Sequence, residues 1–186
     1  FVFPGQGSQQ VGMLQGLFDE LPEVAQTFAE SSEVLGYDLW QLVSEGPQER
    51  LNLTEQAQPA LLTSSIALWR AWLARCSYRP VFLAGHSLGE WSALVAAGVV
   101  SFTDAVRLVR LRGHYMQAAV PAGVGAMAAI LGLEDAKVEQ ACQQGSELGI
   151  VVPVNFNSPG QVVIAGENAA VEAAMASATG LGASKA

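Results

Sequence analysis

An apolar run that leads into a glycine-flanked serine constrains the fold of this chain more than any other feature. Val81-Phe82-Leu83-Ala84 predicts a strand, Gly85-His86-Ser87-Leu88-Gly89 a sharp turn, and residues 90–97 a helix. A strand, a Gly-x-Ser-x-Gly turn and a helix form a nucleophile elbow, which lies at the carboxyl edge of an α/β sheet. The pattern therefore predicts an α/β fold with an exposed Ser87 hydroxyl and a Leu88 N–H free to bind an oxyanion. The alternative is an ordinary turn in which Ser87 only caps the helix.

Composition limits the classes of function. The 186 residues are 51% hydrophobic, which is enough for a sizeable core. No stretch approaches the ~20 apolar residues of a membrane span, and we expect a cytoplasmic protein without membrane contact. The net charge of −8 argues against nucleic-acid binding, which needs a basic face. The chain has only two histidines and two distant cysteines, Cys76 and Cys142, so we expect no metal and no cofactor.

The first two thirds of the chain alternate short strands with helices. Phe1-Val2-Phe3 predicts a buried strand, and a glycine-rich loop follows it. A short apolar element is expected at 38–43, before the Gly46-Pro47 break. Apolar residues at helical spacing predict helices over 22–35, from Gln58-Pro59 to 76, over 90–97 and over 104–117, with a cap at Ser101 or Thr103.

The pattern changes after Pro121-Ala122-Gly123. We expect a strand, a helix, two strands and a second helix, over 126–131, 134–145, 150–155, 161–165 and 168–179. The two strands are joined by Asn157-Ser158-Pro159-Gly160, a strong turn signal. This order is a split βαβ, ferredoxin-like pattern that lacks its last strand.

Arg112 is the second informative residue. Ala105, Leu108, Val109 and Met116 share one face of the predicted helix, and Arg112 falls within that apolar stripe. A guanidinium on an apolar face needs an anionic partner. The spacing alone leaves three possibilities open: a structural salt bridge, a side chain that extends to the surface, or a clamp for a substrate carboxylate.

The loop Gly5-Gln6-Gly7 follows the first strand. Its glycines allow close backbone approach, so Gln6 can supply a second oxyanion N–H beside that of Leu88. An ordinary glycine-rich turn is the alternative. The serine also needs a general base. His86 adjoins Ser87 but should point away from the hydroxyl, and His114 falls on the wet face of its helix, so neither is a convincing base.

Five ordered motifs resemble the malonyl-CoA:acyl carrier protein transacylases of bacterial fatty acid synthesis. They are Phe3-Pro4-Gly5-Gln6-Gly7-Ser8-Gln9, Gln58-Pro59-Ala60-Leu61, Gly85-His86-Ser87-Leu88-Gly89-Glu90, Arg110-Leu111-Arg112-Gly113 and Asn155-Phe156-Asn157-Ser158-Pro159-Gly160-Gln161. The resemblance covers essentially all of residues 1–186.

The resemblance implies a fold with two parts and an active-site cleft between them. Residues 1–121 would form the N-terminal part of an α/β-hydrolase-like core with a parallel sheet. Residues 122–186 would form a ferredoxin-like small subdomain without its last strand, so both parts would be incomplete.

It also implies a site and a reaction. Ser87 would be the nucleophile, Gln6 and Leu88 the backbone donors of the oxyanion hole, and Arg112 the clamp on the malonyl carboxylate. The substrate would be malonyl-CoA and the partner acyl carrier protein, with ping-pong transfer through a malonyl-serine ester. Carrier protein is acidic, so docking would need a local basic patch, for which Arg75, Arg79 and Lys185 are candidates.

One part of the family pattern is absent. The resemblance places the catalytic histidine after the last strand of the small subdomain, beyond residue 186, so we expect residues 1–186 alone to be nearly inactive. Three alternatives stay open at this point: a stand-alone polyketide-type acyltransferase, a serine thioesterase of the α/β-hydrolase type, and an inert or carrier-binding fragment.

Overall fold

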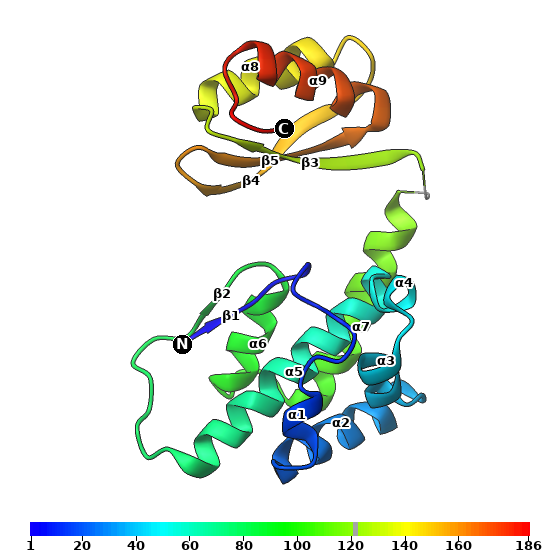
Figure 1. Ribbon diagram of the computed structural model, residues 1–186, viewed down its shortest axis with the longest axis vertical. Coiled ribbons are helices and arrows are strands. Elements are labelled where there is room, and N and C mark those ends of the chain that lie inside the picture. The colour runs from blue at the N-terminus through cyan, green and yellow to red at the C-terminus, as the bar shows by residue number, and fades with distance from the viewer. Residues whose placement is uncertain (121–122) are drawn as a thin grey trace. The chain divides into compact units, whose positions relative to one another are not determined.

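The computed structural model describes residues 1–120 and 123–186, which form two compact units, Phe1–Ala119 and Val120–Ala186 (Figure 1). The domain boundary expected between residues 121 and 122 lies outside the described residues. The described chain is mixed α/β, with a parallel pair of strands in the first unit and an antiparallel sheet in the second.

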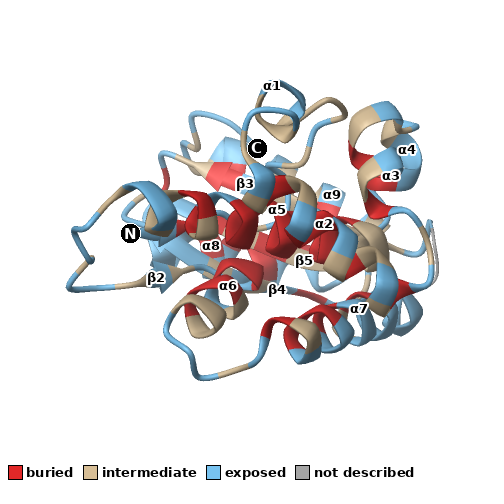
Figure 2. Ribbon diagram, turned by 90° about the horizontal axis from the view of Figure 1, so that it is seen from below, coloured by how far each residue is buried: buried red, intermediate tan, exposed pale blue. Residues whose placement is uncertain are grey.

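The first unit is built around one long central helix, α5 (Thr54–Arg75). Its elements are β1 (Val2–Phe3), α1 (Gln15–Phe18), α2 (Pro22–Leu35), α3 (Leu39–Glu45), α4 (Gln48–Leu51), α5 (Thr54–Arg75), β2 (Ala84–Gly85), α6 (Leu88–Ala96) and α7 (Phe102–Ala119). Helix α5 is buried on every side from Ala57 to Ala67, although this stretch includes the polar residues Gln58, Thr63, Ser64 and Ser65 (Figure 2). It packs against α2, α6 and α7, so it forms the centre of this core.

The elbow strand is shorter than predicted. Only Ala84 and Gly85 pair with β1, in parallel register with Val2 and Phe3. Val81 and Phe82, which were expected in the strand, are exposed by 86% and 81%. Parallel strands are normally paired on both sides and covered on both faces, and β2 has only β1 beside it among the described residues.

Helix α5 begins before the predicted start at Gln58-Pro59. The N–H groups of Gln56 and Ala57 both donate to the Leu53 carbonyl at 2.8 Å, which starts the helix one turn earlier. Pro59 therefore lies inside the helix and not in its first turn. The sequence offers Ser101 and Thr103 as candidates for the N-terminal cap of α7. Ser101 provides the cap, because its hydroxyl accepts the Asp104 N–H at 3.2 Å.

The second unit has the predicted order of elements. It contains β3 (Gly125–Leu131), α8 (Asp135–Gly145), β4 (Val151–Ser158), β5 (Gln161–Glu167) and α9 (Asn168–Gly180). The strand order is β3-β5-β4, and all neighbours are antiparallel. Both helices cover the same face of the sheet (Figure 1), where Ile130, Val162 and Ile164 are buried.

Candidate active site

Ser87 occupies a strained turn between β2 and α6. Its backbone has φ 54° and ψ −109°, a region that residues with a side chain rarely adopt. The flanking glycines permit the turn: a Cβ on Gly85 would lie 2.0 Å from the Gly89 carbonyl carbon, and one on Gly89 would lie 2.3 Å from the Phe3 carbonyl oxygen. The Ser87 side chain is exposed at the end of the strand, as the sequence predicts.

The two predicted oxyanion donors lie on adjoining segments. The Leu88 side chain is buried in the core, and its N–H is at the start of α6. The Gln6 loop passes against the elbow, since a Cβ on Gly5 would lie 3.1 Å from the His86 carbonyl oxygen. Neither the Gln6 N–H nor the Leu88 N–H has a protein acceptor among the described residues. Both N–H groups are therefore unpaired within the described residues.

Side chains at the end of α4 and the start of α5 hold the Gln6 loop in place. The Gln6 amide donates to the Thr54 hydroxyl at 3.2 Å, and the Gln9 amide donates to Asn52 at 3.0 Å. The Gln9 side-chain Oε1 in turn accepts the Gly7 N–H at 2.8 Å. These contacts fix the backbone beside Gln6, which is what an oxyanion donor requires.

Arg112 reaches the elbow from α7. Its Nη2 donates to the Ser87 Oγ at 2.9 Å, and its Nη1 donates to the Gln58 Oε1 at 2.8 Å. The side chain is half-buried. A cation thus lies against the hydroxyl of the elbow serine, although 25 residues separate the two in the sequence.

The apolar stripe predicted around Arg112 is partly wrong. Leu108 and Met116 are 42% and 47% exposed. The buried face of α7 consists of Phe102, Ala105, Val106, Val109 and Gly113, the face that packs on α5. Arg112 therefore lies at the edge of the buried face and not in its middle, which lets the guanidinium reach Ser87.

Neither histidine bonds to the serine. His86 is exposed and makes no side-chain hydrogen bond to Ser87 in the part of the chain that the structure describes. His114 lies on the exposed side of α7, with its Nδ1 3.5 Å from the Glu55 Oε2. Residues 1–120 and 123–186 thus place Arg112 against Ser87 and the Gln6 loop against the elbow, without a hydrogen bond from either imidazole to Ser87.

Comparison with known proteins assigns the family. The model of the acyl transferase domain matches residues 1–184. The chain belongs to the acyl transferase domain family. In this domain, the matched region contains Ser87, Arg112, Gln6 and Leu88.

Curated relatives match this acyl transferase domain along its whole length. The malonyl CoA-acyl carrier protein transacylases of Escherichia coli K12 and Salmonella typhimurium LT2 are 60% and 59% identical to it over 186 residues. The alignments cover 100% of this chain and 60% of each relative. The chain therefore spans about 60% of the length of these relatives.

Solved structures show the same fold. A malonyl-transacylase in complex with its type II PKS acyl-carrier protein superimposes with a TM-score of 0.95 at 58% identity, over 99% of this chain and 60% of that one. The malonyl-CoA:acyl carrier protein transacylase of Xanthomonas oryzae also gives 0.95 at 58% identity, over 100% of this chain and 59% of that one.

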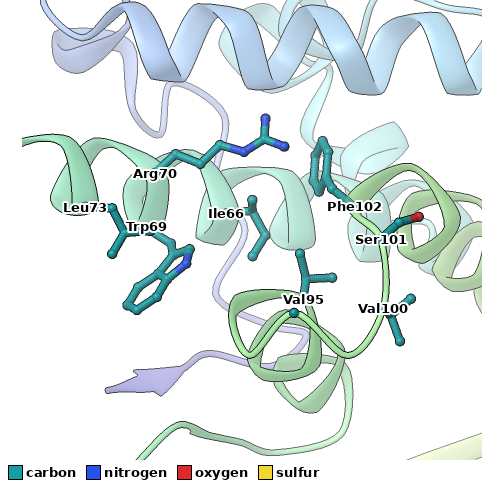
Figure 3. Close-up of a pocket in the computed structure, with 9 residues that line it drawn as sticks. Ile66, Trp69, Arg70, Leu73, Val95, Val100, Ser101 and Phe102 are labelled. Atoms are coloured by element: carbon teal, nitrogen blue, oxygen red, sulfur yellow. The ribbon is translucent and has the colours of Figure 1, made fainter. Parts of the chain in front are cut away.

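A groove in this acyl transferase domain is lined by none of the four site residues Gln6, Ser87, Leu88 and Arg112. The groove, of about 480 Å³, runs between α5, α6 and α7, lined by Ile66, Trp69, Arg70, Leu73, Val95, Gly98, Val100, Ser101 and Phe102 (Figure 3). Its charged residue, Arg70, lies 4.6 Å from the Phe102 ring centroid and 2.7 Å from the Glu30 carboxylate. Because Arg70 is already paired, the groove offers no free charge to an anionic ligand.

Within residues 1–120 and 123–186, no three His, Cys, Asp or Glu side chains lie together in a way that could hold a metal ion. No helix of the described acyl transferase domain has the length and apolarity to cross a membrane.

Proposed function

We propose that the protein transfers malonyl from malonyl-CoA to the phosphopantetheine thiol of acyl carrier protein. The observation that carries this proposal is the 2.9 Å contact between the Arg112 Nη2 and the Ser87 Oγ. In malonyl-CoA, one methylene separates the thioester carbonyl from the carboxylate. A clamp for that carboxylate must therefore lie directly beside the nucleophile, as Arg112 does.

The reaction has two half-steps. The Ser87 Oγ attacks the thioester carbonyl while its proton passes to a general base, and the resulting oxyanion is bound by the N–H groups of Gln6 and Leu88. The C–S bond breaks, the CoA sulfur takes up the proton, and a malonyl-Ser87 ester remains. The carrier thiol then attacks this ester and loses its proton to the base. The C–O bond to Ser87 breaks, the Ser87 Oγ takes up that proton, and malonyl leaves as the carrier thioester.

The base is proposed to be the histidine that the family resemblance places beyond residue 186. Arg112 gives selectivity in both half-steps, because an acetyl group would leave the guanidinium without its anion. None of these steps uses a metal or a cofactor, and we propose that the enzyme acts in the cytoplasm.

The proposal also includes a fold for each of the two units. We assign the first unit to an incomplete α/β-hydrolase-like core and the second to a ferredoxin-like subdomain that lacks its last strand. One contact supports the second assignment: Lys185 forms an antiparallel bridge with Leu131 on the free edge of β3. A fourth strand of a ferredoxin-like sheet would pair at that edge.

The structure constrains the identity of the carrier protein less than that of the acyl group. A close structural relative is bound to a type II PKS acyl-carrier protein, so a polyketide carrier is a second candidate acceptor. Among the three candidate docking residues, Arg75 is paired with Glu23 at 3.0 Å. Arg79 and Lys185 are exposed and form no salt bridge among the described residues.

The test is transfer from labelled malonyl-CoA to holo carrier protein, with native-length wild type and Ser87→Ala. We expect the substitution to lower transfer by roughly 10⁴-fold or more, because the nucleophile is lost. Fatty acid and polyketide carriers used side by side identify the acceptor. Release of free malonate without any carrier would instead indicate a thioesterase, and carrier binding without transfer would indicate a binding protein.

A further inference from the structure

Gln58 is a fully buried polar residue that the mechanism above does not use. Its side chain projects from α5, and its exposed fraction is 0%. Both ends of the amide are engaged: the Oε1 accepts from the Arg112 Nη1 at 2.8 Å, and the Nε2 donates to the Met116 sulfur at 3.3 Å. Arginine has only donors, so the amide can serve it only in this orientation.

The Gln58 amide carries no charge, and this matters for Arg112 as much as the position of the amide. Arg70, on the same helix as Gln58, donates to the Glu30 carboxylate at 2.7 Å, and its charge is balanced. Arg112 instead donates to an amide oxygen and a hydroxyl, both neutral. No carboxylate lies within salt-bridge distance of Arg112 among the described residues. A half-buried cation without a counter-ion strongly favours an incoming anion.

The two hydrogen bonds of Arg112 also differ in whether a substrate can displace them. The Nη1 is bound to the amide oxygen of Gln58, which is fully buried. The Nη2 points to Ser87, which is exposed and open to substrate. A carboxylate can therefore replace the Ser87 contact while Gln58 keeps the guanidinium in place.

We propose that Gln58 is a positioning residue for substrate selection: it holds Arg112 beside Ser87 and, because it is neutral, leaves the arginine charge for the acyl carboxylate. This inference rests on the proposed malonyl transfer. Gln58 makes no hydrogen bond to Ser87 among the described residues, so it acts through Arg112. A glutamate at this position would keep the side-chain size and supply an internal counter-ion that competes with malonyl.

The decisive variant is Gln58→Glu in the native-length protein. Malonyl and acetyl transfer to holo carrier protein are measured in parallel as kcat and KM. We expect kcat/KM for malonyl-CoA to fall roughly ten- to a hundredfold, the range of a hydrogen bond to a charged group. The loss should appear mainly in KM, and acetyl transfer should change by less than about twofold because acetyl does not use the charge.

Two further variants separate this role from a structural one. Gln15→Glu adds the same charge at an exposed position on α1, and its malonyl-to-acetyl ratio should equal that of wild type. Gln58→Met removes the acceptor without adding charge, so it should lower malonyl transfer more than acetyl transfer. If Gln58→Glu does not fold, as judged by thermal unfolding, Gln58→Met decides the question.

A malonyl-to-acetyl ratio in Gln58→Glu within about twofold of wild type would overturn the inference, as would equal losses with both acyl groups in Gln58→Met. Failure of the proposed function has a different signature, because wild type itself would then not transfer malonyl. Failure of the inference is therefore read from the Gln58 variants, and failure of the proposed function is read from wild type in the same assay.

Discussion

At the scale of single residues, the site depends on groups that are held ready but are not yet paired with an anion. The Arg112 guanidinium contacts only neutral oxygens, and the N–H groups of Gln6 and Leu88 have no protein acceptor among the described residues. Such donors are preorganised for negative charge. They suit a substrate that carries a carboxylate and forms an oxyanion during the reaction.

The role of Arg112 predicts a change of selectivity when it is removed. Arg112→Ala in the native-length protein should lower malonyl transfer by about a hundredfold, the loss expected of a charge-assisted hydrogen bond, and acetyl transfer much less. Arg107→Ala on the same helix is the matched control, since Arg107 is exposed and pairs only with Asp104. An unchanged malonyl-to-acetyl ratio in Arg112→Ala would refute the clamp.

Tyr37 provides a test of the core by pH. Burial raises the pKa of Tyr37 from 10.0 to about 12, although the nearby Arg110 and Arg50 act in the opposite direction. Between these values, the unfolded chain loses the phenolic proton and the folded chain keeps it, so the free energy of unfolding falls as pH rises. This loss should be absent from Tyr37→Phe.

Urea unfolding below pH 10.0 and about one unit above it measures the difference. The tyrosine hydroxyl has no hydrogen-bond partner in the described structure, so Tyr37→Phe should cost little at neutral pH. Equal losses of stability in both proteins at the higher pH would contradict the assignment.

Sequence reasoning located some site residues and missed another for clear physical reasons. Ser87 and Leu88 belong to a local motif whose geometry follows from its two glycines, so the turn could be predicted. Arg112 gave a signal because a charge near apolar residues needs a partner. Gln58 entered only as part of the motif Gln58-Pro59-Ala60-Leu61 and not as a site residue, since its importance comes from a contact with a residue 54 positions away.

At the scale of elements, the crossing of α5 and α7 sets the geometry of the site. Helix α5 carries Gln58 and α7 carries Arg112. They meet closely at Gly113, where a Cβ would lie 2.6 Å from the Glu55 Cα and 2.7 Å from the Thr54 carbonyl oxygen. Only a glycine allows the backbones to approach so closely, and the approach brings the two side chains together.

Gly113→Ala should therefore push the two helices apart. We expect the free energy of unfolding to fall by roughly 1–3 kcal/mol, the usual cost of overpacking. Gly16→Ala is the control, because Gly16 lies in helix α1 and a Cβ there meets nothing within 4 Å. Urea denaturation of both variants measures the difference, and equal midpoints would show that the crossing tolerates a methyl group.

Element boundaries show where local patterns fail. Helix α2 runs over Pro22–Leu35 as predicted, because a proline at its first turn and a glycine after its end mark both limits. Helix α5 starts earlier than its proline suggests, since bonds to Leu53 close the first turn before Pro59 is reached. The one-turn helices α1 and α4 escaped prediction because four residues carry no periodicity.

At the scale of the whole molecule, all the predicted site residues belong to the unit Phe1–Ala119. Neither histidine of the described residues hydrogen-bonds to Ser87, and the family resemblance places the general base beyond residue 186. A polypeptide limited to residues 1–186 should therefore transfer malonyl about 10³-fold or more slowly than a full-length relative. The Escherichia coli relative is a suitable reference for this comparison. Normal turnover by a polypeptide shown by mass to end at Ala186 would contradict this placement of the base.

Ser87 should carry the acyl group between the two half-reactions, and the intact mass of the protein after incubation with malonyl-CoA reveals whether it does. The native-length protein should gain one malonyl group, and peptide mapping should place it on Ser87, with no adduct on Ser87→Ala. A folded, native-length protein that gains no malonyl group, or gains it on another residue, would contradict the account.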